Sequence, residues 1–432
     1  MYRGDSSTQP ATVYVAGAVR DAAGVHAAPG AVALRAGRIV AAGPVEPVLQ
    51  AAGPNARSFE LDHRLLIPGL VNAHTHLDLT GVGYRPFTGD FVSWGKMIIG
   101  ARQSSGGNYG PAVFTGAQLC ASAGVLTVGD IAGAWQATLA LRQTGLRGVS
   151  YAEVGGLGSS LVRCPPSAWL SVDRSNGVAN GIQPHAPYST GPAMYRSAVR
   201  LAAARQMPLA THLAELHEEI EFVAAAAGPM RRFLDELGKW DDRYLAFYGG
   251  GQHPVEWLFA NCGTVADERS ALTPNLSQGE RGLAPRWLLA HCNYVEDAHI
   301  RLLAEHRASV AYCPRASEYF GHRNHRYRDM LAAGVNVCLG TDSIICHGTL
   351  SILDEMRRLY QRDRTDPEIL LKMATVNGMR GLGLDEKDAT FAPDANPGVV
   401  AIRYDPRSGV DPLERVLSAD APPEIEVLEV PQ

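Results

Sequence analysis

The segment LLIPGLVNAHTH, residues 65–76, is an apolar run that closes on two histidines, His74 and His76. Seven further apolar runs also end on polar residues. A strand buried in a parallel sheet is typically an unbroken apolar stretch, and in barrels of eight such strands the reactive side chains lie where strands run into loops. The runs predict an α/β fold with a (β/α)8 barrel of TIM type, and the seven later runs carry Asp130, Glu153, His185, His212 with Glu215, His291, Arg315 and Asp342.

Helical periodicity between these runs supports alternating strands and helices. Apolar residues recur at helical spacing in residues 192–206, 218–238 and 349–363. Residues 84–112 are rich in Gly and aromatic residues, and we expect a loop or short helix that covers the strand ends. Residues 264–286 are polar and rich in Ser, Pro and Gly, which indicates a surface insertion with little order and no assigned function.

Both ends of the chain carry short strand-like segments outside the barrel pattern. Residues 12–67 contain valine-rich and alternating segments separated by Gly and Pro, which is typical of hairpins. GVVAIRYDP, residues 398–406, is too short to form a sheet alone, so we expect it to pair with the first segments. The predicted organisation is a barrel at 68–390 and a small composite β-sandwich built from 1–67 and 391–432.

Composition is that of an ordinary globular protein. Of 432 residues, 46% are hydrophobic and 19% charged, and no apolar stretch approaches the roughly 20 residues that span a bilayer. The first ten residues lack the apolar core of a secretory signal, so we expect a cytoplasmic protein without membrane partners. The net charge of -5 and the scattered arginines give no footprint for nucleic acid, and the seven cysteines, an odd number without a Cys-x-x-Cys pair, indicate reduced structural thiols.

The strand ends predict a metal site. His74 and His76 flank one residue of a strand, so both side chains project to the same face. With His212, His291 and Asp342 at other strand ends, they form a set of imidazole and carboxylate groups. Zinc favours such ligands, and Fe²⁺ and Mn²⁺ also accept them.

The motifs PGLVNAHTH, ATHLAE, LAHC and LGTDS, in this order, resemble the amidohydrolase superfamily, and within it the metal-dependent deaminase and chlorohydrolase branch. The finer motifs HTHLDL, PHAPYST, HLAELHEE, YCPRASEYFGH and NVCLGTDS are most similar to aminofutalosine deaminase-like proteins. The resemblance extends from about residue 34 to about residue 404. It implies a (β/α)8 barrel with a composite β-sandwich; a homodimer is common among such barrels.

The resemblance also implies roles for individual residues. His74, His76, His212 and Asp342 would hold one divalent metal ion. Glu215 would shuttle a proton, His291 would hydrogen-bond the attacking hydroxide, and Asp342 would also accept a proton. Relatives with two metals bridge them through a lysine at a strand end, and none of Lys96, Lys239, Lys372 and Lys387 ends a predicted strand, which favours a single metal.

Four residues are candidates for substrate binding: Trp94, His185, Arg315 and His322. Each has a structural alternative: Trp94 could only pack its loop, His185 could be a structural histidine, and Arg315 and His322 could support their loop. We expect Glu219 to lie on a solvated helix face. Residues 344–347 depart from the Ala-Ser-Asn that follows Gly-Thr-Asp-Ser in the most similar group, which leaves the substrate open.

The predicted function is hydrolytic deamination of an amino-substituted nitrogen heterocycle, with a small-molecule substrate. An adenine nucleoside-like compound is favoured, and aminodeoxyfutalosine is the specific candidate implied by the resemblance. Two alternatives stay open. The same metal site could hydrolyse an amide, imine or carbon–halogen bond, because loops choose the leaving group, or the fold could serve a non-catalytic binding protein.

Overall fold

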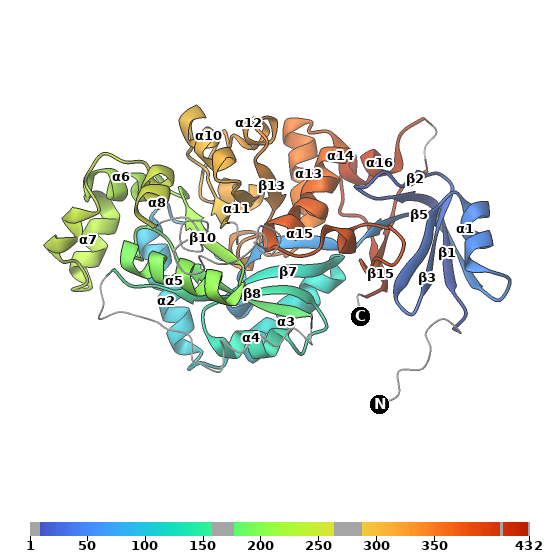
Figure 1. The fold of residues 1–432 in the computed structure, drawn as a ribbon, viewed down its shortest axis with the longest axis horizontal. Helices are drawn as coiled ribbons and strands as arrows, with labels where there is room; N and C mark the ends of the chain where they lie inside the picture. The colour runs from blue at the N-terminus through green and yellow to red at the C-terminus, as the bar shows by residue number, and fades with distance from the viewer. Residues whose placement is uncertain (1–8, 158–176, 263–286, 407–408, 431–432) are drawn as a thin grey trace, which may run out of the picture.

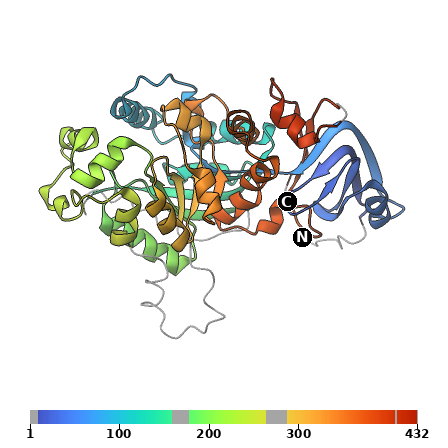
Figure 2. The ribbon, with the colours of Figure 1, turned by 90° about the horizontal axis from the view of Figure 1, so that it is seen from above.

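The computed structural model describes residues 9–157, 177–262, 287–406 and 409–430. They form an eight-stranded parallel barrel surrounded by helices and a separate sheet built from both ends of the chain (Figure 1). Two views at right angles place this sheet at one end of the molecule, beside the barrel (Figure 1, Figure 2). The fold class predicted from the sequence is confirmed. The predicted insertion at 264–286 lies outside the described residues.

All eight apolar runs form barrel strands. The strands pair in parallel in chain order, from β6 to β13, so each strand lies between its sequence neighbours. Their bounds are β6 Leu70–Thr75, β7 Val125–Ala132, β8 Arg147–Val154, β9 Val178–Pro184, β10 Leu209–Leu213, β11 Trp287–His291, β12 Ser309–Tyr312 and β13 Asn336–Leu339.

The first and last strands join just beyond the regular ladder. Thr75 and Asp342 form an isolated parallel bridge, and the backbone N–H groups of Thr341 and Asp342 both donate to the carbonyl of His74, at 3.1 and 3.0 Å. The buried Asn72 side chain donates to Thr341 Oγ1 at 2.8 Å and accepts from the Thr341 N–H at 3.1 Å. These bonds bring the beginning and the end of the barrel into contact.

Helices cover the outside of the barrel, and short helices fill the loops. The segment 218–238 forms two helices rather than one, because Ala226 and Gly228 adopt positive φ angles of 50° and 83° between them. The helices are α2 Phe91–Ser104, α3 Gly110–Ser122, α4 Trp135–Leu141, α5 Pro192–Arg205, α6 His217–Ala225, α7 Gly228–Glu236, α8 Pro254–Cys262, α10 Asp297–Glu305, α11 Pro314–Tyr319, α12 Tyr327–Ala332, α13 Ile352–Asp363, α14 Pro367–Ala374 and α15 Val376–Leu382, with 3-10 turns η2 Leu77–Val82, η4 Asp242–Ala246, η5 Ile344–Cys346 and η6 Glu386–Ala389.

The segment 84–112 contains a full helix. Helix α2 runs for 14 residues, and it begins at the side chain of Asp90, which accepts from the Val92 N–H at 3.0 Å. An aspartate at this position satisfies one of the free N–H groups of the first turn. The expected loop or short helix is thus a four-turn helix lying over the strand ends.

The terminal sheet confirms the expected pairing of the two chain ends. It has the order β15-β14-β5-β1-β3-β4, with β2 on β1. Strand β14 pairs antiparallel with β5, for example Ile402 opposite Leu65, and β5 runs parallel to β1, so the sheet is mixed. The division of the chain at residues 67 and 390 stays a prediction. The bounds are β1 Thr12–Arg20, β2 His26–Ala27, β3 Gly30–Arg35, β4 Arg38–Gly43, α1 Val45–Ala52, β5 Arg57–Pro68, β14 Val399–Arg403, α16 Pro412–Ser418 and β15 Ile425–Glu429.

Packed side chains fill the barrel interior, so the chemistry is confined to one end. A buried cluster inside the barrel joins strand residues such as Val71, Ile131 and Tyr151 to Met379 and Leu382 of α15. A filled interior leaves the carboxyl ends of the strands as the open end, where barrel enzymes place their sites. The cysteines of the described residues are all free and buried, as expected. In the described parts of the chain, no helix is both long and apolar enough to span a bilayer.

Gly148 provides a test of the barrel packing. It lies on β8 at φ +140°, and a Cβ built there would sit 1.8 Å from the carbonyl oxygen of Val128 on β7. We predict that Gly148→Ala lowers the free energy of unfolding by about 2–4 kcal/mol, in the range of strained backbone positions. Urea unfolding followed by circular dichroism measures this.

Gly100→Ala is the matched control. Gly100 lies within α2, and nothing approaches its virtual Cβ within 4 Å. This substitution should be neutral or stabilise the protein by up to about 1 kcal/mol, because alanine is the better helix former. Equal unfolding midpoints for the two variants would contradict the packing described here.

Candidate active site and metal centre

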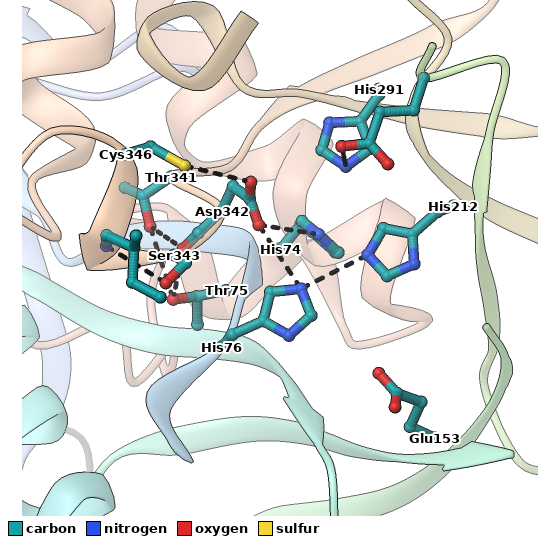
Figure 3. A network of polar contacts seen from close by, with 12 residues as sticks. His74, Thr75, His76, Glu153, His212, His291, Thr341, Asp342, Ser343 and Cys346 are labelled. Atoms are coloured by element: carbon teal, nitrogen blue, oxygen red, sulfur yellow. Dashed lines mark hydrogen bonds and ion pairs between the residues drawn. The ribbon is translucent and has the colours of Figure 1, made fainter. Parts of the chain in front are cut away.

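Four buried histidines and one aspartate converge at the carboxyl end of the barrel (Figure 3). His74 is the last residue but one of β6 and His76 directly follows the strand. His212 lies on β10, His291 ends β11, and Asp342 follows β13. His291 and Asp342 adopt positive φ angles of 74° and 56°, a conformation uncommon for residues with a side chain. Such backbone outliers occur where the surrounding structure fixes a functional side chain.

The nitrogen and oxygen atoms of this group approach one another closely. Asp342 Oδ1 lies 3.4 Å from His76 Nε2 and 3.8 Å from His74 Nε2, and His76 Nε2 lies 3.4 Å from His212 Nε2. Candidate ligand atoms of His74, His76 and Asp342 lie within 4.8 Å of one another, and so do those of His74, His212 and His291. The structure therefore brings together all the residues predicted from the sequence as metal ligands.

Electrostatics explain why this arrangement fits a cation. Burial, followed by repulsion from neighbouring histidines, lowers the pKa of His74 and of His76 well below the usual value. Burial lowers the pKa of His212 to about 3, so these imidazoles are neutral near pH 7. Neutral nitrogens then face each other and a carboxylate, and the buried Nε2 of His74 has no hydrogen-bond partner among the described residues. A divalent cation would satisfy these electron-pair donors.

A backbone contact orients one of the ligands. Nδ1 of His212 lies 2.9 Å from the carbonyl oxygen of His185, to which it can only donate. This tautomer leaves Nε2 with its lone pair directed at His76 and His74. Metal-binding histidines are commonly held in this way by a carbonyl on the other ring nitrogen.

Glu215 and His291 lie beside the ligand set. Glu215 Oε1 is 3.5 Å from His291 Nε2, and Glu215, His291 and Asp342 also have ligand-type atoms within 4.8 Å of one another. Burial, then the neighbouring Asp342 and Glu219, raise the pKa of Glu215 well above its usual value. Burial raises the pKa of Asp342 to about 7. In both carboxyl groups burial favours the protonated form.

The prediction that Glu219 lies on a solvated helix face is wrong. Its side chain is buried rather than solvated, and it accepts from the backbone N–H groups of Ala214 and Glu215, at 2.9 and 2.8 Å. The turn after β10 folds back onto this carboxylate, so Glu219 holds the backbone of the residue that carries the proton. Glu221, two residues further along the same helix, is exposed.

A cavity of about 600 Å³ opens beside the metal centre. Two of the four predicted substrate-binding residues, Trp94 and His185, line it. Trp94 stacks on Phe91 with ring centroids 5.3 Å apart, and the His185 ring lies 4.9 Å from that of His212. Their contact with substrate stays a prediction.

The other two predicted residues lie elsewhere. Arg315 donates to Glu355 Oε1 at 2.7 Å, to Thr349 at 2.8 Å and to the carbonyl of Ser351 at 3.2 Å, so its guanidinium is engaged by the protein. His322 bonds to the hydroxyl of Tyr294 at 2.6 Å and lines a different cavity of about 590 Å³. Their contact with substrate also stays a prediction, and these contacts do not favour it.

Side chains of the loop after Asp342 form hydrogen bonds within the protein. His347 lies 2.7 Å from the carbonyl of Thr341, which its Nε2 can only approach as a donor, and Cys346 Sγ donates to Asp342 Oδ2 at 3.7 Å. The residues at 344–347 that differ from the most similar group therefore influence the position of Asp342. His347 contacts the backbone of the turn that carries Asp342, and Cys346 contacts its carboxylate.

Sequence reasoning gave no role to a buried charged group at the edge of the cavity. Arg102 donates to Asp78 at 3.0 Å and to Glu153 at 2.9 Å. Glu153 was recognised only as a strand end. Helical spacing would have indicated Arg102: Phe91, Ile98 and Arg102 are seven and four residues apart, and all line the cavity.

The comparisons agree with the architecture. Residues 65–402 match the model of the amidohydrolase family. The barrel, with its buried ligand-type cluster at the strand ends, is that of a hydrolase, and the chain belongs to the amidohydrolase family. It is a hydrolase acting on carbon–nitrogen bonds.

Several relatives carry deaminase names. Aminodeoxyfutalosine deaminase of Deinococcus radiodurans is 29% identical over 332 residues, covering 74% of this chain and 73% of that protein. The 5-methylthioadenosine/S-adenosylhomocysteine deaminase of Pelotomaculum thermopropionicum is 26% identical over 379 residues, covering 83% and 76%.

Solved structures show the same fold. Aminofutalosine deaminase of Helicobacter pylori, in complex with methylthio-coformycin, superposes with a TM-score of 0.72 at 18% identity, covering 96% of this chain and 97% of that one. An adenosine deaminase of Xanthomonas campestris with bound zinc gives a TM-score of 0.70 at 20% identity, covering 94% and 89%.

Removing one ligand tests the metal centre. We predict that wild-type protein retains about one divalent ion per chain after dialysis, and that His76→Ala retains far less. Metal added at 100 times its Kd should stabilise the wild type by about 2.7 kcal/mol, and His76→Ala should lose most of this gain. Elemental analysis and thermal melting measure the two effects.

His63→Asn is the control for this experiment. His63 is exposed on β5 at a positive φ of 57°, which asparagine tolerates. Its metal content should equal that of the wild type. If His76→Ala retained the same amount of metal as His63→Asn, the ligand assignment would be wrong.

Proposed function

We propose that this protein is a hydrolytic deaminase that uses one divalent metal ion, zinc in preference to Fe²⁺ or Mn²⁺, to release ammonia from an adenine nucleoside-like substrate. Aminodeoxyfutalosine is the specific candidate. The deaminase names of the relatives support this proposal, as does the adenine-like chemistry that those names share. The zinc of the adenosine deaminase structure supports the choice of metal.

One observation carries the proposal: the buried carboxyl group of Glu215 lies beside the ligand set, 3.5 Å from His291. Deamination of an adenine ring needs a proton on a ring nitrogen as the carbon is attacked, and a second proton on the departing amine. Burial, then Asp342, raises the pKa of Glu215 well above its usual value, which favours the protonated form that can donate. It is held over the site by the bonds of Glu219 to the turn that carries it.

The residues of the site divide the remaining work. His74, His76, His212 and Asp342 would hold the metal. When bound, the metal supplies a Lewis acid that lowers the pKa of water toward neutrality. His291, 3.5 Å from Glu215, can hydrogen-bond the attacking oxygen, and the carboxylate of Asp342 can take up its proton. General acid–base groups are most effective when their pKa is near the working pH.

The neighbouring cavity supports a substrate with a flat ring and a sizeable substituent. Its volume of about 600 Å³ lies within the range of small-molecule sites, and aromatic side chains such as Phe91, Trp94 and Phe233 line it. The homodimer and the cytoplasmic location stay predictions.

Glu215→Gln tests the proposed reaction. We predict that wild-type protein loaded with zinc releases ammonia from adenosine, 5-methylthioadenosine or aminodeoxyfutalosine, and that Glu215→Gln lowers kcat by at least about 100-fold, because the amide cannot deliver the proton. A coupled ammonia assay measures both rates. The variant should retain its metal, and its metal content therefore distinguishes loss of the proton donor from loss of the metal site.

Glu221→Gln is the matched control, since Glu221 is an exposed glutamate on the same segment. Its activity should equal that of the wild type. Absence of ammonia from every adenine compound, together with release from an amide or halide substrate, would replace the deaminase proposal with another hydrolase activity.

A further inference from the structure

A buried ion-pair group lies in the wall of the otherwise largely apolar cavity. Arg102 of α2 and Glu153 at the end of β8 both line the cavity beside side chains such as Ile98 and Leu234. Charges buried in apolar surroundings cost stability unless they are paired, and the proposed reaction uses neither residue. Their position indicates a role in binding.

Both side chains are held in fixed positions. Arg102 donates from Nε to Asp78 Oδ2 at 3.0 Å and from Nη1 to Glu153 Oε1 at 2.9 Å. The Asp78 side chain is fully buried, and those of Glu153 and Arg102 are only 9% and 16% exposed. Nη2 of Arg102 is buried without a hydrogen-bond partner among the described residues. The group therefore keeps one donor available beside a fixed carboxylate.

The charge of the group selects the kind of ligand. Burial opposes the charged form of Arg102, but Asp78 and Glu153 outweigh it and raise its pKa, so the guanidinium is charged. Asp78 and Glu153 place two carboxylates beside the single guanidinium, so the group offers hydrogen-bond acceptors as well as a donor. A neutral hydroxyl can donate to a carboxylate and accept from a guanidinium.

The location fits the substituent of a ring bound at the metal centre. Glu153 lies beside His76 and His212 (Figure 3), and His185 lines the same cavity. A heterocycle placed with its amine-bearing carbon at the metal centre would direct its substituent past Glu153 into the cavity. The apolar walls beyond, including Leu157 and Met230, suit an uncharged extension of that substituent.

We propose that Arg102 and Glu153 form the subsite for the vicinal hydroxyls of the sugar in the substrate. One hydroxyl donates to Glu153, and a hydroxyl oxygen accepts from Nη2 of Arg102. The cavity beyond, which is mostly apolar, takes the 5′ substituent. This inference rests on the proposed function, because it assigns the sugar of the proposed nucleoside.

Paired substrates test this subsite. Wild-type protein loaded with zinc should deaminate adenosine with a kcat/KM at least about tenfold above that for 2′,3′-dideoxyadenosine. Glu153→Gln should raise KM for adenosine about tenfold with little change in kcat, because hydrogen bonds to a charged acceptor are about twice as strong as those to a neutral one. The KM of Glu153→Gln for 2′,3′-dideoxyadenosine should differ from the wild-type value by less than about threefold. Glu60→Gln, on the exposed part of β5, is the matched control and should change neither value.

Binding without turnover gives a second measurement. In a Glu215→Gln background, calorimetry should show tighter binding of adenosine than of 2′,3′-dideoxyadenosine, and Glu153→Gln should remove most of this difference. Thermal melting establishes that each variant is folded. Equal loss of kcat for both nucleosides in Glu153→Gln, or equal affinity of the two for the parent protein, would overturn the subsite.

The two proposals fail in different ways. Ammonia release without discrimination between the nucleosides would remove the subsite and leave the deaminase. Glu153-dependent binding of adenosine without ammonia release would keep the subsite and remove the deaminase. Absence of both binding and release for adenosine would overturn the two together.

Discussion

Closure of the barrel between its first and last strands is the constraint on which the site depends. His74 and His76 come from the first strand and Asp342 follows the last, more than 260 residues later. The carbonyl of His74 accepts from the N–H groups of Thr341 and Asp342, and Asn72 bonds Thr341 twice. These bonds fix the left-handed backbone of Asp342, which turns its carboxylate toward the histidines. Backbone strain of this kind, of order 1–3 kcal/mol, persists only where surrounding bonds over-determine it.

Burial gives the site both its affinity for a cation and its acid–base properties. The same loss of water that lowers the pKa of the histidines raises those of Glu215 and Asp342. Desolvation therefore leaves imidazoles as free electron-pair donors and carboxyl groups that can hold a proton. A single physical cause, acting with opposite sign on bases and acids, prepares the ligand set and the proton carrier.

The sequence was informative where burial follows from local pattern. Each barrel strand is an unbroken apolar run, and residues such as His212 and Asp342 converge because parallel strands end at one edge. Pairing of residues 398–406 with the first segments followed from their inability to form a sheet alone. Charge burial was not predictable in this way: Glu219 is buried because a turn folds back onto it, and Arg102 because Asp78 and Glu153 compensate its charge. Those partners are set by tertiary packing, as is the direction in which Arg315 and His322 face.

The metal centre and the cavity are connected through the turn that follows β6. Directly after His76, the N–H of Leu77 donates to the buried Asp130 at 2.9 Å, and Asp78 accepts from Arg102 of α2. One short turn thus links a metal ligand to the helix that forms the cavity wall. A substrate bound to Arg102 would also restrain the turn carrying His76, and a metal that fixes His76 would hold Asp78 in place for Arg102. Since coupling between two binding sites is reciprocal, each ligand should then favour the other.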